Sequence, residues 1–360
     1  MRLVADSGLW STGRQPAQAQ LVAVLEVSGA VLSWTVDDAA HAAQITFTDL
    51  DHADWLWRVL GEPGHIALAT ALHEGTPEAA VELADVDLKP ETLEPLRRLA
   101  LGHWLRRWWP TSQRNGIAAL DAALLDAEIA MLTAGAEEFF TDDTFDSDVA
   151  ALLRPHTAAL SAHLQGGDPR AVELVRSCAD LADDLGVAFA EADSVAVRRD
   201  DYALAAGADG DGRGAGSIAT GTGSVNWGAV PPGIFDAAED TIHWQLEAAD
   251  GSAKAIVRVD LSGPGLAAGI NVRLRSGDFR GAGVLDANGV ARFPILDGPH
   301  PVAESAAWDH DWRSTAVTVG ADVEESPQTR ERIREFARAR LRAPGGDAFL
   351  AEVLAAESDY

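Results

Sequence analysis

The sequence holds one compact acid–base cluster, Asp309-His310-Asp311, flanked by Trp308 and Trp312. A histidine beside two carboxylates offers the residue types that general acid–base catalysis and metal binding use. The cluster follows a series of short predicted strands and is expected in a loop, where such a trio is also common on ordinary protein surface. The sequence therefore favours ordinary surface, with an acid–base or metal site as the alternative.

Other candidate groups fit known chemistry less well. His156 and His163 lie two turns apart on one predicted helix face, but the sequence identifies no third metal ligand. His73-Glu74 lacks the second histidine of a helical zinc site. Cys178 is the only cysteine and shares a predicted helix face with leucines, so we expect a buried core residue rather than a nucleophile. We therefore expect no metal and no cofactor.

Signatures of nucleotide binding and of serine hydrolases are also missing. The glycine-rich run 214–228 has neither the lysine nor the strand–loop–helix context of a phosphate-binding loop. No G-x-S-x-G elbow occurs in the chain. Active sites can assemble from scattered residues, so an enzyme remains an alternative.

Residues 96–110 concentrate aromatic and cationic side chains, with three of the eleven tryptophans, four arginines and no acid. Helical spacing places Leu101, Trp104, Leu105 and Trp108 on one apolar face, and Pro110 ends the predicted helix. Tryptophan and arginine are typical of binding hot spots. The predicted partner-binding residues are Arg97, Arg98, Trp104, Arg106, Arg107, Trp108 and Trp109.

The alternative for this stretch is a structural role. Residues 117–193 contain 16 acids and three bases, so carboxylates of the following helices can pair with the arginines. Trp104 and Trp108 would then belong to the core, with Trp109 packed beside Pro110. We expect most of these arginines to be paired.

Charge and composition exclude several classes of partner. The formal net charge is −28, which disfavours nucleic acid because phosphate binding requires cationic surface. No apolar run is long enough to cross a membrane, and residues 1–8 do not resemble a signal peptide. We expect a cytoplasmic chain whose partner is another protein.

Length and composition predict an α+β multidomain protein. Its expected parts are a mixed α/β N-terminal region (1–88), a helical block packed with that region (89–204), a glycine-rich linker (205–223), an antiparallel β-sandwich (224–322) and C-terminal helices (323–360).

Turn residues and periodicity place the main elements of these parts. The run 20–36 predicts a hairpin around Ser28-Gly29, and 81–88 predicts an edge strand. Helices are expected at 90–110, 117–140, 146–164 and 168–185, the last with a capping Asp and a Pro at its first position. In the sandwich, Asn288-Gly289 predicts a hairpin between the strands 283–286 and 290–295.

The residues Val272-Arg273-Leu274 and the run from Gly281 to Phe293, which contains the turn Asp286-Ala287-Asn288-Gly289, resemble the hairpin of transthyretin-like (prealbumin-type) bacterial β-sandwich modules. The resemblance covers roughly 25 residues. It implies a non-catalytic accessory or binding domain.

These observations favour a non-enzymatic interaction or scaffold component of a bacterial multi-protein system, acting through the Trp/Arg helix and the β-sandwich. The alternative is an enzyme of a family that the sequence does not identify, or an accessory component of a peptide-modifying system. A flat exposed aromatic face would favour the first function. A deep cleft holding His103 or the trio 309–311 would favour the second.

Overall fold

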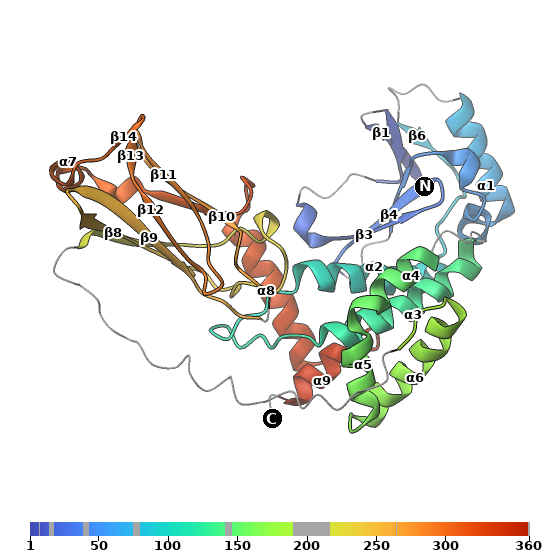
Figure 1. Cartoon of the computed structure of the whole chain (residues 1–360). Coiled ribbons are helices and arrows are strands. Elements are labelled where there is room, and N and C mark those ends of the chain that lie inside the picture. The colour runs from blue at the N-terminus through green and yellow to red at the C-terminus, as the bar shows by residue number, and fades with distance from the viewer. Residues whose placement is uncertain are drawn as a thin grey trace. The chain divides into compact units, whose positions relative to one another are not determined.

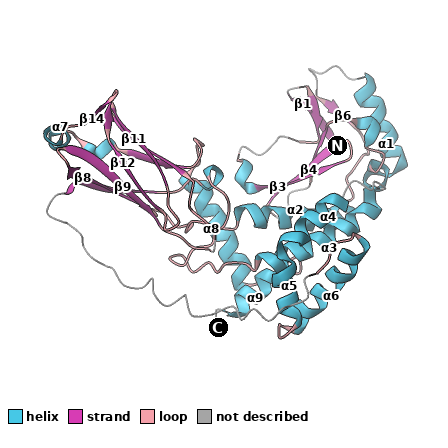
Figure 2. Ribbon diagram, in the orientation of Figure 1, coloured by secondary structure: helices cyan, strands magenta, loops and turns pink. Residues whose placement is uncertain are grey.

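The structure is a computed structural model that describes residues 1–6, 8–13, 18–38, 43–74, 80–140, 146–189, 217–263 and 265–358. Its described residues form helices and three antiparallel sheets, so the α+β class that the sequence predicts is confirmed (Figures 1 and 2). The chain divides into two units. Unit 1 comprises residues 1–109, 120–192 and 331–360, and unit 2 comprises residues 110–119 and 193–330.

Unit 1 contains a six-stranded sheet in the order β3-β4-β5-β2-β1-β6. Its strands are β1 (Arg2–Asp6), β2 (Leu9–Ser11), β3 (Val22–Val27), β4 (Ala30–Thr35), β5 (Gln44–Phe47) and β6 (Val81–Glu82). The predicted hairpin at Ser28-Gly29 is confirmed, with Val27 opposite Ala30. Gly29 has a φ of +71°, and a Cβ there would lie 2.1 Å from the carbonyl oxygen of Asp49, so only glycine fits.

The helices of unit 1 follow the predicted pattern with two corrections. They are α1 (Leu56–Glu74), α2 (Pro90–Trp108), α3 (Ala122–Phe140), α4 (Asp146–Leu153), α5 (Thr157–Leu164), α6 (Pro169–Asp184) and α9 (Leu350–Ser358). α3 begins five residues later than predicted, because the Asp121 carboxylate caps it by accepting the N–H groups of Ala123 and Leu124. The single helix predicted over 146–164 is interrupted by the 3₁₀ turn Arg154–His156, where Pro155 lacks an N–H for the helical ladder.

Only two residues of the edge strand predicted over 81–88 are extended, namely β6. They do lie at the sheet edge, opposite Leu3 and Arg2. The predicted start of α6 is confirmed, since the Asp168 side chain accepts the Arg170 N–H and Pro169 opens the helix.

Unit 2 contains two antiparallel sheets that share one apolar core. The five-stranded sheet, in the order β14-β13-β11-β10-β15, consists of β10 (Asn271–Ser276), β11 (Phe279–Val284), β13 (Leu296–Asp297), β14 (His300–Pro301) and β15 (Ala316–Val319). The four-stranded sheet, in the order β12-β9-β8-β7, consists of β7 (Ser217–Gly223), β8 (Ile242–Ala249), β9 (Ser252–Val259) and β12 (Val290–Pro294). The short helix α7 (Glu304–Asp309) follows β14.

Residues 217–223 were expected in the glycine-rich linker but form strand β7, paired with β8. Gly221 allows this, because a Cβ there would lie 2.4 Å from the ring of Trp244. The rest of the predicted linker lies outside the described residues.

The predicted Asn288-Gly289 hairpin is wrong, although the tight turn itself forms. Asp286 N–H donates to the Val290 carbonyl, and Gly289 has a φ of +72°. However, β11 pairs with β10 and β13, whereas β12 pairs with β9, so the turn carries the chain from one sheet to the other. The ring of Phe293 explains this path, because it fills the space left by Gly281 and Gly283 on the facing sheet.

Segment 110–119 leaves the helical block and packs in unit 2. The Ser112 hydroxyl donates to Asp236 Oδ1 at 2.6 Å, and the Gln113 N–H donates to Oδ2 at 3.1 Å. Ala237 N–H donates to the Thr111 carbonyl. The buried Asp236 thus binds this segment within unit 2, together with a salt bridge of 2.6 Å between Arg114 and Asp260.

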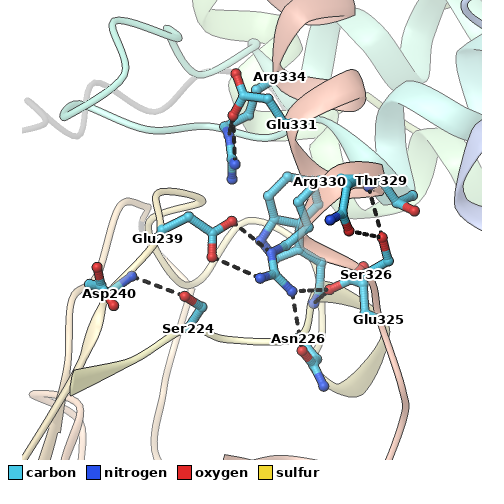
Figure 3. Close-up of polar contacts among 12 residues, drawn as sticks. Ser224, Asn226, Glu239, Asp240, Glu325, Ser326, Thr329, Arg330, Glu331 and Arg334 are labelled. Atoms are coloured by element: carbon cyan, nitrogen blue, oxygen red, sulfur yellow. Dashed lines mark hydrogen bonds and ion pairs between the residues drawn. The ribbon is translucent and has the colours of Figure 1, made fainter. Parts of the chain in front are cut away.

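Helix α8 (Pro327–Arg342) begins in unit 2 beside a buried charge cluster (Figure 3). Arg330 donates to both oxygens of Glu239, at 2.9 and 2.7 Å, and lies 3.6 Å from Glu325. Glu325 is fully buried and accepts the Trp227 N–H, and burial raises the pKa of its carboxyl above the ordinary value. The Arg330 guanidinium thus supplies a positive charge next to the buried Glu325 carboxylate.

In the described part of the chain, no helix combines the length and apolar character that crossing a bilayer requires.

Candidate functional site

The predicted Trp/Arg stretch forms the second half of α2. Leu101, Trp104 and Leu105 are buried, as the predicted apolar face requires, and Trp108 is half-buried. Trp104 is only 2% exposed; its indole N–H donates to the Gln20 carbonyl and its ring packs edge-on against Phe336. A partner therefore cannot reach Trp104 in this fold.

Arg98 holds the C-terminal segment against the helices. Its guanidinium pairs with Glu128, donates to the Ala348 carbonyl and lies over the ring of Phe349. Glu128 also accepts the Leu350 N–H at 2.8 Å, and burial raises the pKa of its carboxyl. Phe349 is fully buried against Gly102, where a Cβ would lie 2.8 Å from the ring. These contacts give Arg98 a structural role.

Arg106 lies beside a second carboxylate of the helical block. Its Nε is 3.1 Å from Asp126 Oδ1, and His156 Nε2 is 3.0 Å from Oδ2 of the same side chain. Asp126 is almost fully buried, whereas the Arg106 side chain is 48% exposed. The expectation that arginines of α2 pair with these helices is therefore confirmed for Arg98 and Arg106.

The remaining predicted partner-binding residues lie nearer the surface. Arg97 is 3.8 Å from Glu94, one turn earlier on the helix. The Arg107 guanidinium lies over the Trp108 ring at 4.4 Å, and both tryptophans at the end of α2, Trp108 and Trp109, are half-buried. The stretch is thus no flat exposed aromatic face.

The trio Asp309-His310-Asp311 does not assemble as an acid–base site. His310 Nε2 lies 3.0 Å from the hydroxyl of Ser276, and among the described residues no hydrogen bond or ion pair joins the ring to either aspartate. Asp311 instead caps the 3₁₀ turn that follows. The imidazole packs against the rings of Phe279 and Trp312, with its centroid 4.5 Å from each, and these two rings also contact each other.

Ser276 also contacts a second hydroxyl, that of Thr315. The Thr315 hydroxyl lies 3.1 Å from Ser276 and 2.7 Å from the Trp312 carbonyl, which can only accept. The Thr315 hydroxyl can donate to Ser276 or to the Trp312 carbonyl, so these contacts hold Ser276 and Thr315 in a hydrogen-bonded chain that ends at His310.

The other candidate chemical groups have structural partners. His163 Nε2 lies 3.0 Å from Asp121, and no three described histidine, cysteine or acidic residues cluster closely enough to hold a metal ion. Cys178 is buried as predicted and its thiol donates to the Ala127 carbonyl. Burial, followed by the nearby Glu128 charge, raises the pKa of the thiol to about 12, so the reactive thiolate is suppressed.

A cavity of about 230 Å³ lies in unit 1 where four elements converge. Helix α2 contributes Leu99, His103 and Arg106, which share one face because they lie at i, i+4 and i+7. The other lining residues are Leu25 and Glu26 of β3, Thr133 of α3, and Asp148, Ala151 and Leu152 of α4. Burial and the adjacent Arg106 charge lower the pKa of His103, so the ring is neutral at physiological pH.

An arginine-rich surface lies on the outward side of the five-stranded sheet. Arg273 and Arg275 alternate with buried residues along β10, and Arg275 is directly opposite Arg280 of β11. We call Arg273, Arg275 and Arg280 the arginine face. None of the three has a hydrogen-bond or ion-pair partner among the described residues.

The residues around the arginine face are small or apolar. Across the sheet, Leu296 and Ala316 flank the Arg280–Arg275 pair, and Ala282 and Thr318 flank Arg273. The outward positions of β10, β11 and β15 in this register carry no acid. The sequence shows the alternation of Arg273 and Arg275, but the pairing with Arg280 depends on register.

Comparisons with protein-family models, with curated proteins and with solved structures gave no match for this chain. The resemblance of residues 272–293 to transthyretin-like modules therefore stays a prediction.

Proposed function

We propose that this chain is a protein-binding component of a bacterial cytoplasmic assembly, and that it binds an acidic segment of its partner on the arginine face. The observation that carries the proposal is the direct opposition of Arg275 and Arg280 across β10 and β11. Like charges at directly opposed positions destabilise an antiparallel pair. A favourable anionic contact from outside would compensate for this cost.

The composition of the chain strengthens the argument. The sequence contains 56 acidic residues against 28 lysines and arginines, so an internal carboxylate could easily have neutralised these arginines. Elsewhere in the described residues, arginines do have such partners, as Arg98, Arg330 and Arg340 show. Arg258 and Arg292 of the other sheet also lack such a partner among the described residues, so what distinguishes the arginine face is the direct opposition of two of its arginines.

An extended acidic peptide fits the spacing of the arginines. Alternate residues of a strand lie about 6.6–6.8 Å apart on one face, so Arg273 and Arg275 match carboxylates at alternate positions of an extended segment. Arginine binds carboxylates with two parallel hydrogen bonds. Val284, 53% exposed at the end of β11, offers apolar contact beside the charges. Nucleic acid fits less well, because the surface lacks aromatic side chains for base stacking and the chain is strongly acidic.

A short synthetic peptide with glutamate at alternate positions tests the proposal directly. Fluorescence anisotropy should show binding to the whole protein that weakens at high salt, as charge pairing requires. The triple variant Arg273→Gln, Arg275→Gln, Arg280→Gln should lose this binding. The matched control is Arg258→Gln with Arg292→Gln, which removes two exposed arginines of the other sheet.

Two results would refute the proposed surface. One is equal binding by the triple variant and the parent. The other is binding of a single-stranded oligonucleotide in preference to the acidic peptide, which would indicate a phosphate-binding surface instead.

The Trp/Arg helix supplies a second patch for the same function, now restricted to its surface residues. Arg107, Trp108 and Trp109 remain proposed partner-binding residues, whereas Trp104, Arg98 and Arg106 have the structural contacts described above. Arg107→Ala combined with Trp109→Ala should leave the melting temperature nearly unchanged and weaken capture of a purified partner. Unfolding of this variant, or unchanged capture, would assign the patch to the scaffold.

One observation favours the alternative function, an enzyme or an accessory component of a peptide-modifying system. The cavity in unit 1 holds His103 with a lowered pKa among apolar and charged groups. A neutral histidine in a pocket is a common general base. This candidate predicts that a small molecule binds in unit 1, independently of the arginine face.

A further inference from the structure

The His103 cavity presents charged groups of both signs above an apolar floor. Leu25, Leu99 and Leu152 are buried and supply the floor. Arg106, Asp148 and Glu26 line the same cavity and are exposed to solvent. Pockets that combine apolar walls with a few polar groups are typical of small-molecule sites.

The charged groups of the cavity are not fully used by the protein. The side chains of Asp148, Glu26 and His103 have no hydrogen-bond or ion-pair partner among the described residues. Arg106 lies near Asp126 through its Nε alone, and Asp126 Oδ1 is a buried atom with no hydrogen bond in this part of the structure. The two terminal nitrogens of Arg106 likewise lack a described hydrogen-bond partner.

We propose that this cavity binds a small zwitterion with an apolar body, the chemistry of a free α-amino acid with an aliphatic side chain. Its carboxylate pairs with the terminal nitrogens of Arg106, because a guanidinium donates two parallel hydrogen bonds to a carboxylate. Its ammonium group pairs with Asp148 and donates to the neutral ring of His103. Its side chain packs on the leucines of the floor.

The volume and charge of the cavity restrict the ligand. About 230 Å³ is below the range of roughly 300–1,000 Å³ typical of drug-sized ligands, so a larger cofactor does not fit. A simple anion would leave Asp148 and Glu26 unpaired, and a simple cation would leave the terminal nitrogens of Arg106 without a partner. A zwitterion pairs with Arg106 and with an acid of the lining at once.

Isothermal titration of the whole protein with leucine tests this proposal. Leucine should bind, whereas 3-methylbutylamine, which lacks the carboxylate, and 4-methylpentanoate, which lacks the ammonium group, should each bind at least about tenfold more weakly. Glycine, which lacks the apolar body, should also bind weakly.

Two variants assign each charge to its side chain. Asp148→Asn should weaken leucine binding at least about tenfold but leave 4-methylpentanoate unchanged, and Arg106→Gln should weaken leucine but leave 3-methylbutylamine unchanged. Asp180→Asn, at an exposed position on α6, and Arg97→Gln, on α2, are the matched controls. Asp148 is exposed and unpaired in the described structure, so its variant is expected to fold even if Arg106→Gln does not.

Three outcomes would overturn the proposal. They are no binding of leucine, equal binding of leucine and either single-charge analogue, and leucine binding that Asp148→Asn leaves unchanged. Each readout is independent of acidic-peptide binding, so failure here would not affect the function proposed for unit 2.

Discussion

The opposition of Arg275 and Arg280 makes a quantitative prediction through charge reversal. Arg280→Glu or Arg275→Glu alone converts the like-charge pair into an opposite-charge pair, while the double reversal places two glutamates opposite each other. The electrostatic contribution of this pair to the free energy of unfolding should therefore become favourable in each single variant, in addition to any cost of glutamate itself at that position. In the double variant this contribution should again be unfavourable.

The size of the effect follows from the distance between the charges. Directly opposite residues have Cβ atoms about 4.5–5.5 Å apart, and the longer arginine side chains place their charges roughly 7 Å apart. Coulomb's law in water then gives about 0.6 kcal/mol, which screening at about 0.15 M salt reduces to about 0.25 kcal/mol. Four such interactions enter the double-mutant cycle, so the coupling free energy should be about 1 kcal/mol.

Urea denaturation of the four proteins measures this coupling. At about 1 M salt the screening length falls to about 3 Å, and the coupling should nearly vanish. All three variants should also lose binding of the acidic peptide, even where the protein becomes more stable. A coupling of zero at low salt, or one that persists at high salt, would refute the assigned register or the electrostatic origin of the effect.

Three further predictions concern groups with clear structural roles. Arg330→Met should lower the free energy of unfolding by about 3–5 kcal/mol near neutral pH, because it leaves Glu325 buried without its cation. The control Arg332→Met, at an exposed ion pair, should cost only about 0–1 kcal/mol, and adding Glu325→Gln to Arg330→Met should recover part of the first loss. Equal losses for the two arginine variants in urea denaturation would contradict this explanation. Hydrogen bonds from Arg170 lower the pKa of Asp168 to about 2, so the carboxylate stabilises α6 above its ordinary pKa and this stabilisation is lost as the pH falls toward about 2. The difference in melting temperature between the parent and Asp168→Asn should therefore shrink over that pH range. A constant difference would exclude this role. Cys178 should resist alkylation in the folded protein and react in denaturant, as mass spectrometry would show, and rapid labelling of the native protein would contradict its burial.

The sequence was sufficient to predict turns, helix starts and buried helix faces whose causes lie within a few neighbouring residues. The turn at Ser28-Gly29 needs a positive φ, the Asp168-Pro169 pair supplies a cap and a preset φ, and the spacing of Leu101, Trp104 and Leu105 defines a buried helix face. In each case the requirement lies within a few residues, so the structure agrees with the prediction. Charge composition also predicted that acids of the following helices would pair with Arg98 and Arg106.

The same local rules failed where a distant contact decided the outcome. Asn288-Gly289 forms its tight turn, but Phe293 packs against glycines of the other sheet, so the two strands separate instead of pairing. Pairing of segment 110–119 with unit 2 depends on Asp236, more than one hundred residues away. Periodicity in a sequence shows which residues share a face of one helix or strand, so it gives no signal for partners that lie this far apart along the chain.

For the two proposed binding sites, too, the sequence predicts some features and only the tertiary structure decides the others. Alternation along a strand is enough to place Arg273 and Arg275 on one face, and composition alone shows that acids are abundant. Only the register of β10 and β11 sets Arg280 opposite Arg275, and only the packing of β3, α2, α3 and α4 encloses His103 with Arg106 and Asp148. Periodicity determines the direction of a side chain from its own element, whereas the neighbours that it meets are chosen by how the elements pack.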